Sequence, residues 1–438
     1  MSAKIAGELM TQRRFLPLLL AQCLGSLNDN LFRYGLVTMV TYSGLSLFGL
    51  ERDILVPIAA SMITLPIFLF SAIAGRLADK YDRTCIMRVT KQIEIWIMLL
   101  AALALFLRQP LLLLPTLFLM GTQSAFFTPA KNSALPSLMA PHELVPANAL
   151  LSGFLNVSIL LGVALGTWLA VVPLGPEVIG AGLVVIAIFG WISARQLPRV
   201  EAANRDLPVT FNFIAETFRV LGYALKAPEV LRPLLGAAWF WMLAASIITL
   251  MPVFTASVLG ADATVVLLFS ALFTIGAAVG ALLCGALSGK GDALAFSIAG
   301  VIGLVIFTTD VALATWSNPI VPAGAPLIGA GAFFADPSNW RLLADLGFAA
   351  VSAGLFVVPL QAMAQRRAAP EMRGRLLAAG GIMNAATATL GQFTLAFIAL
   401  GHLPIQTAFL LIASGSLLAA AIIGWRLALR RKPASAPS

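Results

Sequence analysis

The sequence has 438 residues, of which 60% are hydrophobic and only 11% are charged. Soluble domains average about 25% charged residues, so a chain of this composition cannot bury its apolar surface within itself and must face lipid. The net charge of +9 is better explained by Lys and Arg on the cytoplasmic side of a membrane than by binding to nucleic acid. The three cysteines have no Cys-x-x-Cys spacing, which argues against a disulfide framework or a metal site.

Twelve segments are long and apolar enough to span a bilayer, which takes about 20 residues. The first segment begins at Phe15 and is too long for the apolar region of a cleavable signal peptide, so we expect none. The predicted spans are 15–46, 54–78, 85–107, 111–132, 146–172, 177–197, 231–258, 264–288, 293–315, 342–364, 373–400 and 404–428. In the fifth span, the pair Gly162 and Gly166 predicts a close-packing helix surface.

The distribution of Lys and Arg predicts the orientation. Basic residues cluster before span 1, between spans 2 and 3, 6 and 7, and 10 and 11, and after span 12. Of the 28 Lys and Arg, only Arg33, Arg52, Arg108 and Arg341 fall toward the opposite side. Because basic residues concentrate in cytoplasmic loops, we expect both termini in the cytoplasm.

Two connections are longer than the others. Residues 198–230 form the longest polar stretch, and the apolar residues of 211–227 recur every three or four positions, as in an amphipathic helix on the inner leaflet. Residues 316–341 are rich in Pro, Gly and Ala and predict a periplasmic loop. We therefore expect an N-terminal bundle of residues 1–197, a cytoplasmic linker of 198–230 and a C-terminal bundle of 231–438.

The two halves also share an internal repeat. In each, a Pro at the end of an apolar span (Pro129 or Pro359) is followed by a polar loop, small residues and an Asn (Asn156 or Asn384). A duplicated six-span unit joined by a polar linker is typical of a transporter with two pseudo-symmetric halves.

The segment GRLADKYDR, residues 75–83, resembles the signature loop between helices 2 and 3 of the major facilitator superfamily. The matching residues are Gly75, Leu77, Asp79, Lys80 and Arg83, whereas Asp82 replaces the usual Gly. The resemblance implies an all-α membrane protein with twelve transmembrane helices in two pseudo-symmetric six-helix bundles. We expect Gly75 to allow close helix approach and Asp79 to form a cytoplasmic latch with a base or a helix N-terminus. The alternative is an ordinary loop whose charges only fix the topology.

Three further segments together are similar to the bacterial lysophospholipid transporter group: AQCLGSLNDNLFRYGL, FFTPAKNSALPSL and PLQAMAQRRAAPEMRGRLLA. This resemblance implies movement of lysophospholipids, mainly lysophosphatidylethanolamine, across the bacterial inner membrane to the cytoplasmic leaflet for re-acylation. The chain ends shortly after span 12, so we expect any acyltransferase or acyl-ACP synthetase to be a separate partner. We further expect a monomer surrounded by membrane lipids, with no cofactor and no bound nucleic acid.

Polar residues inside span 1 are the first candidates for substrate contacts. A charge at mid-bilayer costs on the order of 3 kcal/mol and needs a partner or a wet cavity. Asp29 and Arg33 are one helical turn apart and can meet on one face, whereas Asn28 and Asn30 flank Asp29 on either side. Either Asp29 and Arg33 bind the ammonium and phosphate of a zwitterionic head group, or they are a structural ion pair.

The same two interpretations apply to Lys91 and Glu94, which are three residues apart in span 3. Gln123 and Gln361 are weaker candidates, because amides in spans often serve only to join helices. No metal-spaced set and no Gly-x-Ser-x-Gly motif is present, so we expect a transporter rather than an enzyme. The alternatives to a lysophospholipid flippase working by alternating access are an exporter of drugs or cationic amphiphiles, and a membrane docking partner that transports nothing.

Overall fold

The computed structural model describes residues 7–43, 49–107, 109–140, 142–202, 205–206, 212–287, 293–322, 324–368 and 372–430. Arg108, one of the four basic residues assigned to the outer side, lies outside the described residues.

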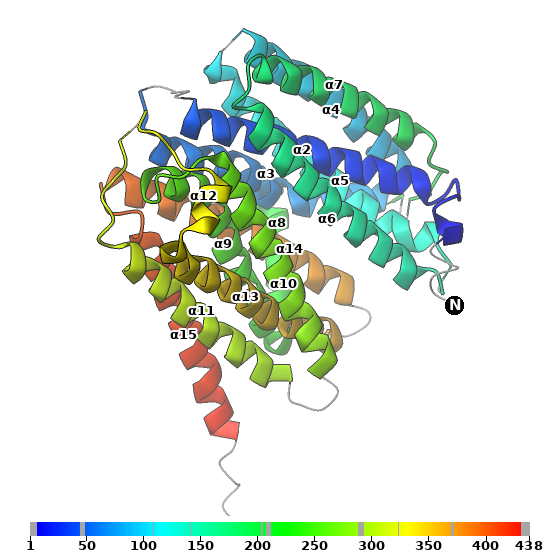
Figure 1. Cartoon of the computed structure of the whole chain (residues 1–438). Coiled ribbons are helices and arrows are strands. Elements are labelled where there is room, and N and C mark those ends of the chain that lie inside the picture. The colour runs from blue at the N-terminus through cyan, green and yellow to red at the C-terminus, as the bar shows by residue number, and fades with distance from the viewer. Residues whose placement is uncertain are drawn as a thin grey trace, which may run out of the picture. The chain divides into compact units, whose positions relative to one another are not determined.

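Twelve long helices correspond to the twelve predicted spans (Figure 1). They are α2 (Leu16–Tyr42), α3 (Arg52–Lys80), α4 (Arg83–Phe106), α5 (Leu113–Leu138), α6 (Leu144–Leu169), α7 (Gly175–Arg195), α9 (Pro228–Ser257), α10 (Ala263–Leu287), α11 (Ala293–Thr315), α13 (Trp340–Arg367), α14 (Arg373–Leu400) and α15 (Thr407–Arg430). Nine helices in the described residues meet a length-and-hydropathy test for crossing a membrane. In the described ranges the only β-type pairing is an isolated bridge between Ala261 and Ile328. The predicted all-α membrane fold is confirmed.

Contacts within the chain divide it into two units. The first unit comprises residues 1–223 together with 381–393, and the second comprises residues 224–380 together with 394–438. The first unit therefore contains α2 to α7 and the middle of α14, whereas the second contains α9 to α13, the two ends of α14, and α15.

Small residues bring α2 and α6 of the first unit into backbone contact. A Cβ added to Gly162 would lie 2.7 Å from the carbonyl oxygen of Leu27, and one added to Gly166 would lie 2.6 Å from that of Leu31. Real Cβ atoms do not approach this closely, so glycine is required at both positions. The predicted close-packing surface is confirmed, and it fixes the part of α2 that carries the polar residues.

The linker contains α8 (Phe213–Leu225), which is attached to the first unit by charge and by aromatic packing. The side chain of Glu216 is only 1% exposed, and it pairs with Arg76 of α3 and, at 2.6 Å, with Arg219. The Phe213 ring packs on Phe70 with centroids 5.6 Å apart. The apolar side chains on the exposed face are those of Ile214, Phe218 and Leu225. The predicted amphipathic helix is present, and its place on the inner leaflet stays a prediction.

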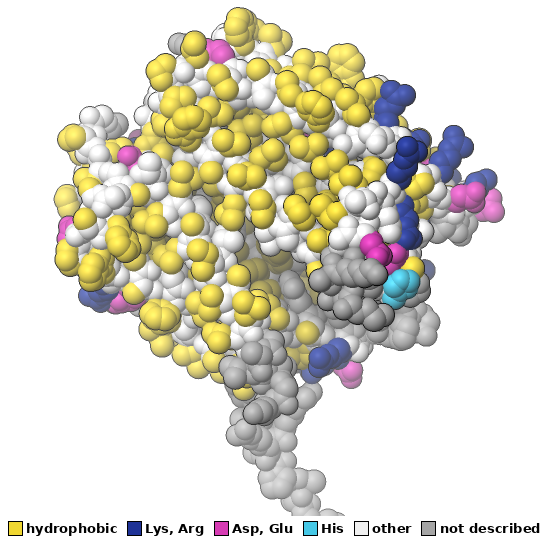
Figure 2. All heavy atoms as spheres, turned by 45° about the vertical axis from the view of Figure 1, so that its right-hand side comes forward, with side chains coloured by type: hydrophobic (Ala, Val, Ile, Leu, Met, Phe, Trp, Pro, Cys, Tyr) yellow, Lys and Arg dark blue, Asp and Glu magenta, His cyan; other side chains and the backbone are white. Residues whose placement is uncertain are grey.

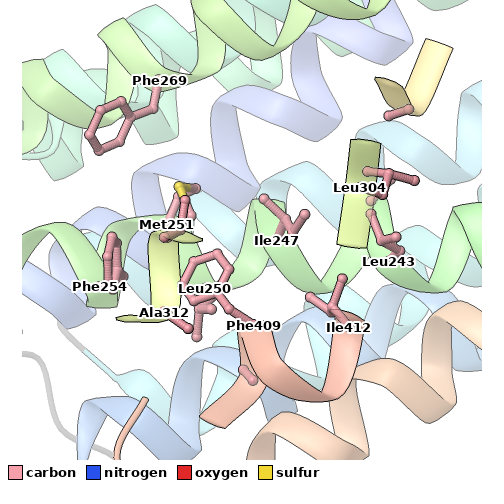
Figure 3. Close-up of a cluster of buried hydrophobic side chains, with 14 of the residues drawn as sticks. Leu243, Ile247, Leu250, Met251, Phe254, Phe269, Leu304, Ala312, Phe409 and Ile412 are labelled. Atoms are coloured by element: carbon pink, nitrogen blue, oxygen red, sulfur yellow. The ribbon is translucent and has the colours of Figure 1, made fainter. Parts of the chain in front are cut away.

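The second unit is built around an apolar core that α9 supplies along most of its length. Figure 3 shows Leu243, Ile247, Leu250 and Phe254 of α9 in this cluster, together with Phe409 and Ile412 of α15 and Leu304 of α11. The rings of Phe254 and Phe409 pack edge to face with centroids 5.1 Å apart.

The connection 316–341, which the sequence analysis predicts to be a periplasmic loop, contains short helical segments. It contains α12 (Ala330–Ala335) and the 3-10 turn η2 (Pro337–Asn339). Phe333 of α12 is 1% exposed and packs on Phe269 at 5.7 Å, and the amide of Val321 donates to the carbonyl of Ser257 at 2.8 Å. An aromatic contact and backbone hydrogen bonds thus hold this apolar segment on the second unit, and its periplasmic location stays a prediction.

The surface agrees with a lipid environment. Figure 2 shows a face covered mainly by hydrophobic side chains, with most Lys and Arg at its rim. Large side chains such as Trp96, Phe106 and Phe397 are about two-thirds or more exposed. Contiguous exposed apolar surface on this scale is rare on soluble monomers.

Candidate functional site

The polar segment of α2 directs its consecutive residues to different neighbours, as a rotation of about 100° per residue requires. Asn28 is fully buried and its amide donates to Oε1 of Glu94 on α4 at 3.5 Å. Asn30 donates to the backbone carbonyl of Ser26 at 2.8 Å, which places its side chain against its own helix. Of the two amides, only Asn28 therefore joins the polar cluster described next.

Lys91 and Glu94 form the predicted ion pair on α4. Nζ of Lys91 lies 2.6 Å from Oε2 of Glu94, and both side chains are only 2% exposed. Gln123 of α5 also donates to Oε2 of Glu94, at 3.0 Å. With Asn28, the Glu94 carboxylate thus has three donors, which is the condition under which a buried ion pair is tolerated.

The Lys91 ammonium occupies a space that sequence reasoning did not identify. A Cβ on Gly25 would lie 2.3 Å from Nζ of Lys91, so Gly25 on α2 leaves room for the ammonium. On another side, Nζ lies 5.0 Å from the ring centroid of Phe127, a cation–π distance. In the sequence, the glycine one turn before Asn28 indicates that a neighbouring group approaches α2 closely at this position. The sequence does not indicate that this group is the Lys91 side chain.

Asp29, like Asn28, has a buried side-chain oxygen without a hydrogen-bond partner in the described residues. Ser124 of α5 donates to its Oδ2 at 3.2 Å, whereas Oδ1 is buried and has no hydrogen-bond partner in the described residues. Ser124, which the sequence analysis also missed, has a single hydroxyl proton that it can donate either to Asp29 or, at 3.5 Å, to Oε1 of Gln123. The unpartnered carboxylate oxygen is a position where a ligand cation would gain a contact.

Asp29 and Arg33 do not form the structural ion pair that was one of the two interpretations of their spacing. Within the described ranges no ion pair joins the two side chains. The Arg33 guanidinium instead lies 5.8 Å from the ring centroid of Tyr34. The i, i+4 spacing permits a contact, but Ser124 holds Asp29 toward α5 while the Tyr34 ring holds Arg33.

Gln361 does not belong to the unit that contains this cluster. It is an exposed residue of α13 in the second unit, whereas the other candidates belong to the first unit. The first-unit cluster therefore consists of Asn28, Asp29, Lys91, Glu94, Gln123 and Ser124.

The signature segment 75–83 comprises the end of α3, the two connecting residues Tyr81 and Asp82, and the first residue of α4. Asp82, which replaces the usual Gly, is the N-cap of α4 and accepts from the backbone amide of Cys85 at 3.0 Å. Arg83 donates to the Ser137 hydroxyl at 3.2 Å, and Lys80 lies 5.9 Å from the centroid of the Tyr81 ring.

A Cβ at Gly75 would meet no atom of the described residues within 4 Å. In these residues the structure thus shows no close helix contact at Gly75, and its expected role in close approach stays a prediction. Asp79 is exposed near the end of α3, and its role as a latch stays a prediction.

An ion pair at the start of α2 fixes this end of the first unit. Arg14 lies 2.6 Å from Glu143, and it also donates to the carbonyl of Leu138 at 3.1 Å. The pKa of the Glu143 carboxyl is held below its ordinary value by the backbone amide of Ala140, which donates at 2.8 Å, and by the Arg14 guanidinium. The charged form of Glu143 therefore ties α2, the end of α5 and the start of α6 together.

Comparison with known proteins gives a family and a fold. The Major Facilitator Superfamily model matches residues 18–347. A search of the curated proteins finds no significant match.

Several solved structures share the fold. A peptide transporter in complex with sulfate is 13% identical with a TM-score of 0.72, and the match covers 98% of each chain. A bacterial homolog of the human lysosomal transporter Spinster, in an inward-facing conformation, is 16% identical with a TM-score of 0.64, over 94% of this chain and 96% of that one. A bacterial homologue of the iron transporter ferroportin is 15% identical with a TM-score of 0.64, over 94% and 98%. At these identities the likeness concerns the fold alone.

Proposed function

Because the chain belongs to the Major Facilitator Superfamily, we propose that this multi-pass membrane protein is a lysophospholipid transporter. It moves lysophosphatidylethanolamine-like lipids across the bacterial inner membrane to the cytoplasmic leaflet by alternating access, and an acyltransferase or acyl-ACP synthetase re-acylates them there. The transporter fold, which it shares with carriers of unrelated substrates, supports the general activity. The substrate class rests on the residues of α2.

The observation that carries the substrate proposal is that Asp29 and Arg33 are one turn apart and are not paired with each other. One turn of helix is about 5.4 Å, a separation that suits a head group with an ammonium next to a phosphate. Asp29 offers an unpartnered oxygen to the ammonium, and Arg33 offers a guanidinium to the phosphate. Lys91 and Glu94 bind each other, and Glu94 also accepts from Asn28, the residue before Asp29.

A flipping assay in proteoliposomes tests the proposal. Labelled lysophosphatidylethanolamine, lysophosphatidylglycerol and a cationic drug are supplied in turn, with protein-free vesicles and the double variant Asp29→Asn/Arg33→Gln as controls. We expect wild-type protein to move the lysolipids and the double variant to be inactive. Movement of the drug alone would favour an amphiphile exporter. No movement of any compound, together with binding of an acyltransferase, would favour the docking partner.

Topology can be measured with a single cysteine. In a cysteine-free background, Ser338→Cys places a thiol at an exposed position of η2. With both termini in the cytoplasm, as the distribution of basic residues predicts, an impermeant maleimide should label it in intact cells. A protein that retains only the native, exposed Cys85 is the matched control and should be labelled only after permeabilisation. The reverse pattern would invert the proposed orientation.

A further inference from the structure

Gln392 of α14 is a buried glutamine whose amide group has no hydrogen-bond partner in the described residues. Its side chain is 0% exposed, and both Oε1 and Nε2 are unpaired. No other side chain in the described ranges has two buried polar atoms that both lack a partner. A buried polar group without a partner is destabilising and rare in folded proteins. The presence of an amide at this position therefore needs a reason other than the stability of the fold.

The amide does not join helices, although the packing around it would allow this. Thr389 lies one turn before Gln392 on the same face of α14, and its hydroxyl is 2.9 Å from that of Thr64 on α3. By contrast, the buried Gln406 donates to the carbonyl of Thr315 on α11 at 2.9 Å. The helices one turn away are thus close enough for a hydrogen bond, yet Gln392 forms none within the described part of the chain.

A hydrogen bond between α2 and α3 sets a common reference for depth. Arg52, the first residue of α3, donates to the carbonyl of Thr41 on α2 at 3.4 Å, so these two residues lie at one level. Asp29 on α2 and Thr64 on α3 are each twelve residues deeper, which is about 18 Å along a helix. Asp29 and Thr64 therefore lie at about the same depth.

Gln392 lies about one turn from that depth, on the side of Arg33. Thr389 is level with Thr64 because their hydroxyls are hydrogen-bonded. As the second and eleventh spans, α3 and α14 run in opposite directions, so the next turn of α14 leads back toward the start of α3. Gln392 is therefore at the level of Arg33 and about one turn from Asp29. All of these residues belong to the first unit.

The chemistry of the amide indicates which group would satisfy it. The amide has a donor and an acceptor side by side, and a hydroxyl is a group that both accepts and donates. In a lysophosphatidylethanolamine molecule the phosphate and the ester only accept, and the ammonium only donates. Its one hydroxyl is that of glycerol, on the carbon next to the one that carries the phosphate. A phospholipid with two acyl chains has an ester in place of this hydroxyl.

We propose that Gln392 binds the free glycerol hydroxyl of the substrate, and that this contact selects lysolipids against phospholipids with two acyl chains. With the ammonium at Asp29 and the phosphate at Arg33, the hydroxyl beside the phosphate is at the level of Gln392. A site that hydrogen-bonds a substrate hydroxyl rejects an analogue without it, because the polar groups of the site are then left unpaired. The identity of the ligand rests on the proposed function, whereas the unpartnered amide does not.

Thermal unfolding tests the unpartnered amide without any ligand. Gln392→Met replaces the amide by an apolar side chain of similar length, and we expect the melting temperature to rise by about 2–4 °C because a buried unpaired group is lost. The matched control Gln406→Met removes a hydrogen-bonded amide and should lower the melting temperature. A Gln392→Met protein that is no more stable than wild type would show that the amide contributes to the fold, and would overturn the proposal.

Transport by the wild-type protein tests the ligand. Lysophosphatidylethanolamine is compared in proteoliposomes with its deoxy analogue, in which a hydrogen atom replaces the glycerol hydroxyl and nothing else changes. We expect wild-type protein to move the deoxy lipid about 10-fold more slowly, because the amide is again left unpaired. Gln392→Met should move both lipids at the same low rate, whereas Gln406→Met should keep the wild-type ratio.

The comparison of the two lipids separates the role of Gln392 from the proposed function. If wild-type protein moves both lipids equally well, it is a lysolipid transporter in which Gln392 does not bind the hydroxyl. If it moves neither lipid, the proposed function is wrong, and the assignment of a lysolipid hydroxyl to Gln392 is wrong with it, whatever the stability of Gln392→Met.

Discussion

Replacing Lys91 by Met is expected to destabilise the first unit by about 3–5 kcal/mol, the range found when one partner of a buried ion pair is removed. The loss arises because Glu94 would keep its charge in a site where it is 2% exposed, with only the amides of Gln123 and Asn28 as donors. The measurement is thermal or denaturant unfolding of the purified protein in detergent, compared with Lys226→Met, which removes an exposed Lys.

Two further variants show whether the loss comes from the uncompensated charge. The double variant Lys91→Met/Glu94→Gln removes both charges and should recover much of the stability, since a neutral pair in this volume leaves no buried ion. Equal melting temperatures for Lys91→Met and Lys226→Met would show that the pair adds nothing to stability.

The sequence alone was sufficient to predict the helices and to predict which side chains meet within one helix. Each predicted span became a helix because about 20 consecutive apolar residues have no other stable form in lipid. Lys91 and Glu94 met as predicted because i, i+3 spacing alone brings side chains together. The contact surface of Gly162 and Gly166 followed from the same periodicity.

Contacts between helices were not accessible from the sequence. Ser124 reaches Asp29 only because α5 packs beside α2 in one register, and a shift of one residue would turn the hydroxyl away. The room that Gly25 leaves for Lys91 depends on the rotation of α2 against α4. The periodicity of the sequence shows which residues share one face of a helix. Only the packing of the folded chain shows which neighbouring helix that face contacts.

Asp29→Asn is expected to lower uptake of lysophosphatidylethanolamine by about 10–100-fold while changing uptake of lysophosphatidylglycerol far less. A hydrogen bond to a charged group contributes about 1.5–3 kcal/mol, and 1.4 kcal/mol corresponds to a factor of ten. The ethanolamine head group has an ammonium for Asp29 to bind, and the glycerol head group has none. Folding should be preserved, because Asn can still accept from Ser124 and Arg33 does not depend on Asp29.

Arg33→Gln makes the complementary test, because both lipids carry a phosphate and both uptakes should fall together. Asp53→Asn, the same chemical change at the first turn of α3, is the matched control and should leave both uptakes near wild type. Expression, melting temperature and uptake of the two lipids are measured on one preparation of each variant. If Asp29→Asn lowers the melting temperature and reduces both uptakes equally, Asp29 supports the fold of α2 against α5 and does not select the head group. If its melting temperature is unchanged and only the ethanolamine lipid is affected, the unpartnered oxygen of Asp29 is the ammonium site.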